Sequence, residues 1–418
     1  MRIAFVCQPW DVLQPSAESG SVQVDTLEAA RRMARQQVNV IIYAPRGRGQ
    51  RRAETFDGVE LRRISTLPDR CLLALLKPLA RLRRRKRPLF SSRFYFLGYV
   101  LQAAIDARRR QCDAVQLINF SQFAPTVRAL NPSAVIALEM ACEWLTDLDD
   151  TVVRPRLRHV DVIQGVSDYI RDRIASKFPE HAFKCRTLRN GRDVSLFKPA
   201  PADAGARRPG TGHVLFVGRL SPEKGVHVLL EAFAMAAERV AGARLTLVGP
   251  CGSPPREFVY AITGDPRIRA MNADFPGDYR LRLLSMVPPH LQDSIVFAGK
   301  IPNRQLPDLY RNADVVAFPS IWNEPSGNPP IEAMASGVPV VSTFAGGIPE
   351  YVEHGKTGLL VEPGNAQALA DAIVTLLTND RLRAEMGAAG RRRAVDRFSC
   401  EHFVQAMLEQ YGEAMRRR

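Results

Sequence analysis

The sequence lacks the features of a secreted or membrane-spanning chain. None of its apolar runs approaches the roughly 20 residues that a membrane-spanning helix needs. The opening run IAFVC is too short for the core of a signal peptide, and a polar, proline-containing loop follows it. We therefore read this run as a first strand and expect a cytoplasmic protein.

The sequence also lacks the paired cysteines of zinc sites and of disulfide frameworks. Its seven cysteines are scattered, and none belongs to a CxxC pair. We therefore expect reduced cysteines and no bound metal. A GxGxxG fingerprint is absent from the first strand-to-helix turn, which weakens any assignment as a dehydrogenase.

Acidic residues are too few to balance the basic ones, so the net charge is +15, which calls for an anionic partner. The run from Lys77 to Arg93 carries eight cations and no acid, between the apolar segments CLLALL and FYFLGY. This combination suits contact with an anionic membrane surface through residues 77–93, although a solvated basic surface remains an alternative. We expect no nucleic-acid partner, because no recognition motif accompanies the charge.

The chain of 418 residues is too long for one ordinary core, so two domains of about 200 residues each are expected. Residues 2–7, 22–37 and 38–44 read as strand, helix and strand, which predicts a parallel sheet with helices on its faces. Further strands are expected at 59–64, 113–118 and 134–138. The run PAPADAGARRPGTG predicts a linker over 199–212, between domains at 1–198 and 213–395.

The richest stretch is FPSIWNEPSGNPPIEAMASGVPVVSTFAGGIPE, from Phe318 to Glu350. It predicts a loop leading into a short helix, with Asn328 as the N-cap and Pro329 at the first helical position. A helix N-terminus favours a phosphate or diphosphate. Glu324 and Glu332 flank it and can accept hydrogen bonds from hydroxyls. The pattern suits a nucleotide sugar, which carries hydroxyl-rich groups on both sides of a diphosphate.

A second motif, GRLSPEKG, follows the strand expected to open the second domain. Gly218 permits a close backbone approach, and Arg219 and Lys224 place two cations in the loop. An arginine fork and a lysine point charge stabilise a diphosphate leaving group, which gains negative charge as a glycosidic bond breaks. A solvated loop with incidental cations is the alternative.

These two motifs resemble the signatures of the retaining glycosyltransferases of the GT-B fold, in particular family 4 (glycosyl transferases group 1). Matching stretches extend from Arg2 to the last helix. The resemblance implies an α/β fold with two Rossmann-like parallel-sheet domains facing an interdomain cleft. It also implies that the last helix, about 396–418, joins the first domain, and that transfer retains the anomeric configuration. No metal or cofactor is implied beyond the nucleotide-diphosphate sugar, which is the donor substrate.

The resemblance assigns roles to individual residues. Arg219 and Lys224 contact the diphosphate, Glu324 orients the donor sugar, and Glu332 bonds the ribose. Relatives have a histidine facing the donor sugar where this chain has Glu139, which we take as a candidate for the same sugar or acceptor contact. The expected donor-binding residues are Gly20, Gly218, Lys300, Ser326, Gly327, Asn328, Pro329 and Pro330.

Several alternatives remain open. A hydrolase or epimerase of the same fold would use the same nucleotide site, and a basic nucleic-acid-binding protein would also explain the charge. The DxD triplet at Asp147 and Asp149 is of the kind that holds metal-bound nucleotide sugars in another fold, but a lone triplet is a weak signal. The sequence names neither the base, with UDP and GDP both open, nor the acceptor, which can be a glycan, a glycolipid or a small molecule. Cell-surface polysaccharide, glycolipid and secondary-metabolite glycoside synthesis all fit. The long connection over 252–293 has no assigned role.

Overall fold

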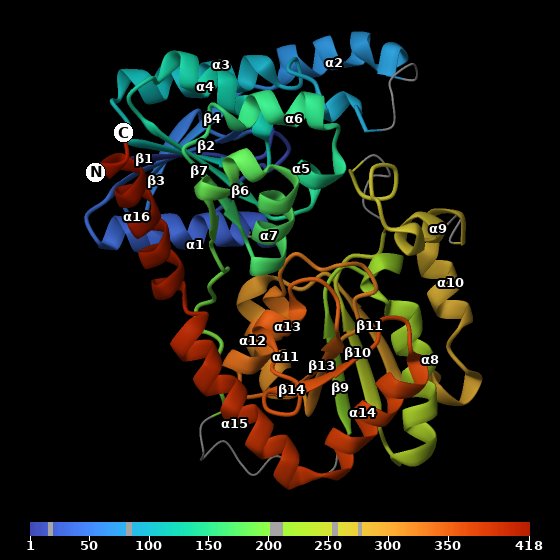
Figure 1. The fold of residues 1–418 in the computed structure, drawn as a ribbon. Helices are drawn as coiled ribbons and strands as arrows, with labels where there is room; N and C mark the ends of the chain where they lie inside the picture. Colours follow the sequence, from blue (N-terminus) through green and yellow to red (C-terminus); the bar gives the residue numbers. More distant parts are fainter. Residues whose placement is uncertain (16–19, 81–85, 201–211, 253–257, 275–277) are drawn as a thin grey trace. The chain divides into compact units, whose positions relative to one another are not determined.

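The computed structural model describes residues 1–15, 20–80, 86–200, 212–252, 258–274 and 278–418. The chain divides into two compact units. The first unit contains Met1–Asn190 and Cys400–Arg418, and the second contains Gly191–Ser399. Each unit has one sheet with helices packed on both of its faces (Figure 1).

The first unit has an eight-stranded sheet in the order β3-β4-β2-β1-β5-β6-β7-β8. All neighbouring strands are parallel except β3, which pairs antiparallel with β4. The strands are β1 (Arg2–Val6), β2 (Asn39–Pro45), β3 (Ala53–Phe56), β4 (Val59–Ile64), β5 (Ala114–Ile118), β6 (Val135–Met140), β7 (Val162–Gly165) and β8 (Cys185–Thr187). The helices are α1 (Ser21–Arg35), α2 (Leu67–Ala80), α3 (Leu97–Arg109), α4 (Ala124–Leu130), α5 (Trp144–Asp147), α6 (Asp150–Leu157), α7 (Asp168–Lys177) and α16 (Cys400–Arg416).

The second unit has a six-stranded, fully parallel sheet in the order β11-β10-β9-β12-β13-β14. The strands are β9 (His213–Val217), β10 (Arg244–Val248), β11 (Ile295–Gly299), β12 (Val315–Phe318), β13 (Val340–Thr343) and β14 (Gly358–Val361). The helices are α8 (Val226–Arg239), α9 (Pro266–Asp274), α10 (Tyr279–Ser285), α11 (Leu306–Arg311), α12 (Asn328–Ala335), α13 (Ile348–Tyr351), α14 (Ala366–Thr378) and α15 (Asp380–Arg397). The expected fold class, two Rossmann-like parallel-sheet units, is confirmed.

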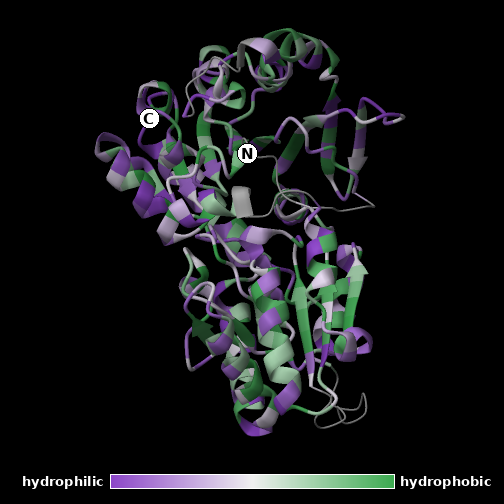
Figure 2. Cartoon of the chain, turned by 90° about the vertical axis from the view of Figure 1, so that its right-hand side faces the viewer, coloured by the Kyte–Doolittle hydropathy of each residue, from purple (hydrophilic) through white to green (hydrophobic). Residues whose placement is uncertain are grey.

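The central strands are runs of apolar residues because helices cover both faces of a parallel sheet. Strand β5 is buried at every position, and so are β6 and β12. Figure 2 shows the same pattern: the strands are mostly hydrophobic, whereas the helices combine hydrophobic and hydrophilic residues. Such helices place one face on the sheet and the other in water.

Strand β3 was not expected from the sequence. It forms a hairpin with β4 through Asp57 and Gly58, which both adopt positive φ angles, 47° and 79°. Two consecutive residues of this kind make the turn that matches the twist of a hairpin, and Asp-Gly is a preferred pair for it. The dipeptide was therefore the signal that could have predicted β3.

The division between the units falls earlier than the expected domain end at residue 198. Residues 191–198 belong to the second unit because Phe197 is buried in its core. Arg391 on α15 also donates hydrogen bonds to the carbonyl oxygens of Val194 and Phe197, at 2.8 and 2.9 Å. Most of the expected linker over 199–212 lies outside the described residues.

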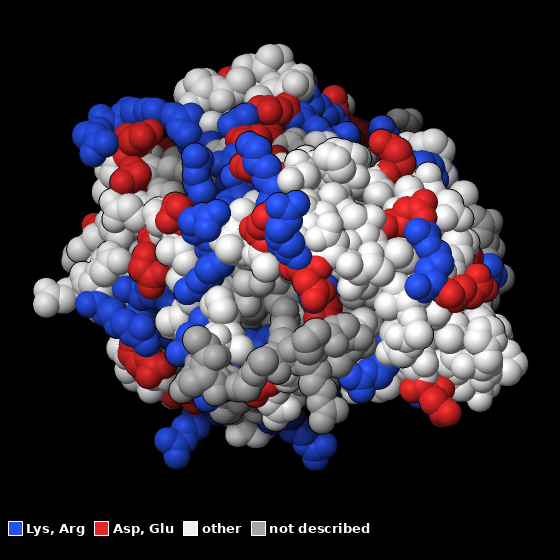
Figure 3. All heavy atoms as spheres, turned by 90° about the horizontal axis from the view of Figure 1, so that it is seen from below, with Lys and Arg blue, Asp and Glu red and all other residues white. Residues whose placement is uncertain are grey.

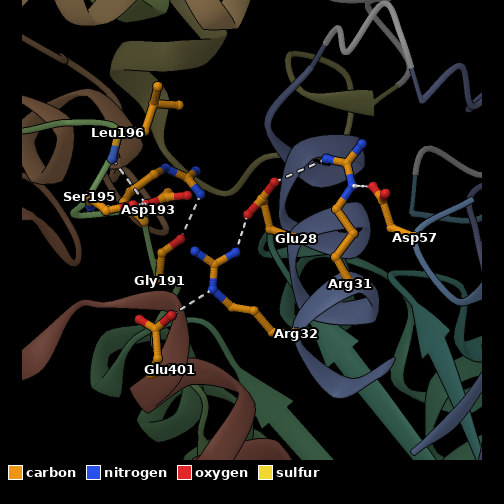
Figure 4. A network of polar contacts seen from close by, with 10 residues as sticks. Glu28, Arg31, Arg32, Asp57, Gly191, Asp193, Ser195, Leu196 and Glu401 are labelled. Atoms are coloured by element: carbon orange, nitrogen blue, oxygen red, sulfur yellow. Dashed lines mark hydrogen bonds and ion pairs between the residues drawn. The ribbon is translucent and has the colours of Figure 1, made fainter. Parts of the chain in front are cut away.

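Helix α16 belongs to the first unit, which is the discontinuity implied by the family resemblance. Its apolar residues Phe403, Val404 and Met407 are buried in the core of that unit. An ion pair also ties it to α1, because Arg32 Nε lies 2.9 Å from Glu401 Oε1 (Figure 4). Within the described ranges, no helix is long and apolar enough to cross a membrane.

Candidate functional site

Three loops of the second unit leave neighbouring strands at one edge of the sheet. They follow β9, β12 and β13, and the carboxyl ends of parallel strands are where such sheets bind ligands. Backbone hydrogen bonds join the loops. The N–H of Ile321 donates to the carbonyl of Glu223 at 2.9 Å, and the N–H of Gly347 donates to the carbonyl of Glu324 at 2.7 Å.

Glu324 is the centre of this edge. Its Oε2 accepts hydrogen bonds from Lys224 Nζ at 2.5 Å, Ser320 Oγ at 2.9 Å and Trp322 Nε1 at 2.7 Å. Across the described part of the chain, no donor is bonded to its Oε1. One oxygen is thus held by the protein, while the other can accept a hydrogen bond from a ligand hydroxyl.

Lys224 is held on several sides. Its ammonium group lies 5.4 Å from the ring centre of Phe318 and 5.1 Å from that of Trp322, within the range of cation–π attraction. The structure therefore joins Lys224 and Glu324, which the sequence placed in two separate motifs. Ser320 and Trp322 were missed; their only signal was their position four and two residues before Glu324.

Glu332 lies on α12 and is bonded by the protein. Tyr310 donates a hydrogen bond to Glu332 Oε2 at 2.7 Å, and Arg192 Nε lies 3.1 Å from Glu332 Oε1. The side chains of Arg192 and Glu332 are only 3% and 8% exposed, so the ion pair is buried. Sequence reasoning missed Arg192, which follows Asn190 and Gly191 where the chain enters the second unit.

The start of α12 differs from the expectation. The N-cap is Gly327, and it makes no side-chain capping bond, so Asn328 is the first helical residue and not the cap. Pro329 and Pro330 have no N–H group, so any backbone contact that they make with a donor uses other atoms, and the expected donor contacts of Ser326 to Pro330 stay predictions. The N–H groups of this turn belong to Ser326, Gly327 and Asn328.

Gly346 is required by the close packing of the loops. It has a φ of +58°, and a Cβ atom there would lie 2.4 Å from the carbonyl oxygen of Glu324. Gly225 is similarly confined, because its Cβ would lie 2.0 Å from the carbonyl oxygen of Pro319. A side chain at either glycine would therefore push the neighbouring loop away.

Arg219 and Lys300 also follow the carboxyl ends of strands in this sheet, but neither is bonded to Glu324 or Glu332. Arg219 follows Gly218 directly after β9, and Lys300 follows Gly299 at the end of β11, the edge strand. Both side chains are exposed, and neither forms an ion pair with another described residue. Both are therefore open to a ligand.

In the first unit, Glu139 is buried at the carboxyl end of β6 and accepts a hydrogen bond from Gln116 Nε2 at 3.0 Å. Burial, and to a lesser extent the charge of Asp25, raises the pKa of Glu139 to about 7. Gly20 is the N-cap of α1 with a φ of +102°, a conformation that favours glycine. The expected contacts of Gly20 and Glu139 with a ligand stay predictions.

The aspartates of the DxD triplet have separate structural environments. Asp149 is the N-cap of α6, accepting from the N–H of Thr151, and it also pairs with Arg87 at 2.9 Å. Asp147 is buried at the end of α5. In the described ranges there is no group of three or more His, Cys, Asp or Glu residues that could hold a metal ion.

The two Rossmann-like units, with a glutamate and a lysine paired at the ligand-binding edge of the second sheet, define the GT-B class. Residues 203–393, most of the second unit, match the family described as Glycosyl transferases group 1, which assigns this part of the chain to that family of glycosyltransferases.

Two relatives and one solved structure show the extent of the similarity. Spore coat protein SA of Bacillus subtilis is 27% identical over 73% of this chain and 80% of its own length. The GDP-mannose-dependent alpha-(1-6)-phosphatidylinositol monomannoside mannosyltransferase of Mycobacterium tuberculosis is 32% identical over 64% of this chain and 66% of its own. Anabaena HepE in complex with UDP and glucose superposes with a TM-score of 0.68 at 20% identity, covering 99% of this chain and 100% of that one. At that identity the likeness concerns the fold alone.

Proposed function

We propose that this glycosyltransferase moves a sugar from a nucleotide-diphosphate sugar to an acceptor hydroxyl with retention of the anomeric configuration. The observation that carries the proposal is the Lys224–Glu324 pair, held at 2.5 Å beside the start of α12. A cation, an oriented carboxylate and backbone N–H groups at one edge are the components that an activated sugar requires.

The residues divide the work by chemistry. Lys224 and the exposed Arg219 stabilise the charge that grows on the departing diphosphate. The open Oε1 of Glu324 accepts a hydrogen bond from a sugar hydroxyl, and the cluster around Oε2 keeps the carboxylate in place. Glu332 bonds the ribose of the nucleotide once the ligand reaches α12. The proposed reaction uses no metal and no cofactor beyond the donor.

The donor is proposed to be a nucleoside diphosphate hexose. GDP-mannose comes first because the mycobacterial relative is named as GDP-mannose-dependent. That relative acts on a phosphatidylinositol mannoside by its name, so a glycolipid acceptor is the first choice here. A panel of UDP and GDP sugars, screened for thermal stabilisation, identifies the donor because a ligand that binds the folded state raises its melting temperature.

Replacing both cations tests the transfer reaction. The variant R219A/K224A should lose at least about 100-fold in transfer rate, since each lost charge contact to the leaving group costs ~1.5–3 kcal/mol. The control K356A/R381A removes two cations of the same unit that are 76% and 87% exposed, and it should keep full activity. Equal turnover in both double variants would refute the assignment.

Product analysis with a labelled donor separates transfer from the two same-fold alternatives. A transferase passes the label to the acceptor, a hydrolase releases free sugar, and an epimerase returns a changed nucleotide sugar. A nucleic-acid-binding protein would not discriminate among nucleotide sugars and would lose most of its affinity as salt is raised.

We also propose that the first unit contacts an anionic membrane from the cytoplasmic side. Helix α2 exposes Leu67 and Leu75, at 66% and 76% of their surface, and Lys77 in its last turn is exposed as well. Part of the basic run over 77–93 lies outside the described residues. Apolar side chains beside cations favour shallow insertion combined with attraction to lipid head groups.

Neutralising exposed cations of this run tests the contact. The variant K77Q/K86Q/R93Q should bind vesicles of anionic lipid about 100-fold more weakly than the parent, since each of the three cations near such a surface is worth ~1 kcal/mol. The control R35Q/R108Q/R158Q removes three exposed cations elsewhere in the same unit. Equal binding of all three proteins would leave the run a solvated surface.

A further inference from the structure

A pocket lies in the first unit, lined by residues of its sheet and of one helix. Residues from the end of β2, from β3, from β4 and from α3 line a cavity of about 530 Å³. This size is typical of a pocket for a small organic ligand. The lining comes from the first unit alone, so the pocket is separate from the Lys224–Glu324 site of the second.

The lining is strongly basic. Arg46, Arg52, Arg62, Arg63 and Arg109 all contribute to it, whereas its one carboxylate belongs to Asp106. A gathering of like charges around one cavity is unfavourable unless carboxylates or a bound anion offset it.

The nearby carboxylates are already engaged. Asp106 Oδ2 accepts a hydrogen bond from Tyr43 at 2.9 Å and lies 2.8 Å from Arg62 Nε and 3.1 Å from Arg110 Nε. Glu54 is in turn paired with Arg63 at 2.6 Å. The charges of Arg62 and Arg63 are therefore balanced by the protein.

The other three arginines of the pocket carry positive charge that no carboxylate balances within the described residues. Arg46, Arg52 and Arg109 are exposed, and among the residues that the structure describes none of them pairs with a carboxylate. They come from three different elements: the end of β2, the start of β3 and the end of α3. Their convergence on one cavity depends on the fold, since Arg109 is distant in the sequence from Arg46 and Arg52.

We propose that this pocket binds the phosphate group of a phosphorylated ligand. Planar guanidinium groups form paired hydrogen bonds with phosphate oxygens, which makes arginine the preferred residue for such recognition. Tyr43, Ile64 and Ile105 give the pocket apolar wall as well, which suits an organic phosphate.

The phosphate can come from a soluble phosphate ester or from a lipid head group. The lipid is included because Ser65, which lines the pocket, is followed two residues later by the exposed Leu67 of α2. The proposal is independent of the transfer reaction, because binding is measured without donor or acceptor.

Two matched double variants test the pocket. R52A/R109A removes two of the unbalanced arginines, whereas the control R51A/R108A removes the exposed arginine next to each, neither of which lines the cavity. All four side chains are exposed, so both variants should melt at the temperature of the parent. The probes are glycerol 3-phosphate, measured by calorimetry, and vesicles of phosphatidylcholine with and without phosphatidic acid, measured by sedimentation.

R52A/R109A should bind about 10- to 100-fold more weakly than the parent, and the control should bind within about twofold of it. A selective loss with glycerol 3-phosphate identifies a soluble phosphate as sufficient, whereas a selective loss with phosphatidic acid vesicles alone identifies a lipid. Equal weakening of both double variants would show that only net charge matters, and would overturn the proposal. Failure of the parent to bind either probe would overturn it as well.

Discussion

Arg192 is the residue that allows a carboxylate to lie buried beneath the candidate site. Its Nε is 3.1 Å from Glu332 Oε1, and both side chains are almost fully buried. An isolated charge in such a place is costly, but a paired and hydrogen-bonded one is tolerated. Tyr310 supplies the hydrogen bond, so the side chains of Arg192, Tyr310 and Glu332, from three different segments, form one cluster.

Removing Arg192 should therefore destabilise the second unit. We expect R192A to lose about 3–5 kcal/mol of unfolding free energy, because Glu332 would keep a buried charge without its partner. The double variant R192A/E332Q should recover a large part of this loss. Equilibrium unfolding in urea measures both, and an R192A protein as stable as the parent would contradict the role given to the pair.

Glu139 should make stability depend on pH. Its pKa is raised from an ordinary 4.5 to about 7, so the folded state holds the proton more tightly than the unfolded chain does. The stability gained from this proton is present below about pH 4.5 and is lost as the pH rises to about 7.

The variant E139Q, which is neutral throughout, should show no such loss. At about pH 8 it should be more stable than the parent by about 1–3 kcal/mol, and at about pH 5 the difference should be much smaller. Melting temperatures at the two pH values measure the effect, with the exposed Glu409 as the control in E409Q. A pH dependence that is the same in the parent and in E139Q would exclude this explanation.

At this scale the sequence predicted the residues of the two motifs but not their partners. Lys224 and Glu324 were singled out because each stands in a recognisable local pattern. Arg192 and Tyr310 belong to no such pattern near α12, and only the folded chain brings them to Glu332. Long-range ion pairs of this kind leave no periodic signal in the sequence.

The loops at the carboxyl edge of the second sheet act as one element because their backbones touch. Gly346 lies against the carbonyl of Glu324, where no Cβ atom fits. We expect G346A to push the loop that carries Glu324 away from Lys224 and to reduce donor binding at least about 10-fold, as misplacement of a binding group by 1 Å is costly.

The control for this prediction is G355A. Gly355 has a positive φ of +77°, comparable with +58° at Gly346, but a Cβ there meets nothing within 4 Å. Both variants share the cost of a left-handed backbone, about 1–2 kcal/mol, and only G346A adds the collision. If both variants bind donor equally well, then the glycine at position 346 is needed for its backbone conformation and not for its close contact with Glu324.

Most elements could be predicted because their patterns are local. The strands expected at 2–7, 59–64, 113–118 and 134–138 correspond to β1, β4, β5 and β6; the bounds of β4 are as predicted, and those of the others differ by at most two residues. Ser167 caps α7 by accepting a hydrogen bond from the N–H of Ile170, which is the common role of a serine just before a helix. Two errors remain. The prediction placed the N-cap of α12 one residue late, and it missed strand β3.

For the whole molecule, the net charge of +15 overstates the positive surface that is open to partners. Arg391 donates to three backbone carbonyls, and Arg63 and Arg192 are buried in ion pairs. Figure 3 shows one face on which Lys and Arg side chains lie among Asp and Glu, so the charge there does not form one uniform patch. Composition alone could not separate these structural arginines from Arg46, Arg52 and Arg109, which pair with no carboxylate among the described residues.

The second unit also begins and ends at the same place. Arg192 pairs with Ser399 in a short parallel bridge, and its N–H donates to the carbonyl of Phe398 at 2.8 Å. The chain therefore leaves the first unit and returns to it through two adjacent backbone segments. The two ends of the segment 191–399 therefore lie side by side. Adjacent ends are typical of a domain that is inserted into a loop of another domain. A segment connected in this way can be exchanged as a whole while the first unit, which includes α16, keeps its own core.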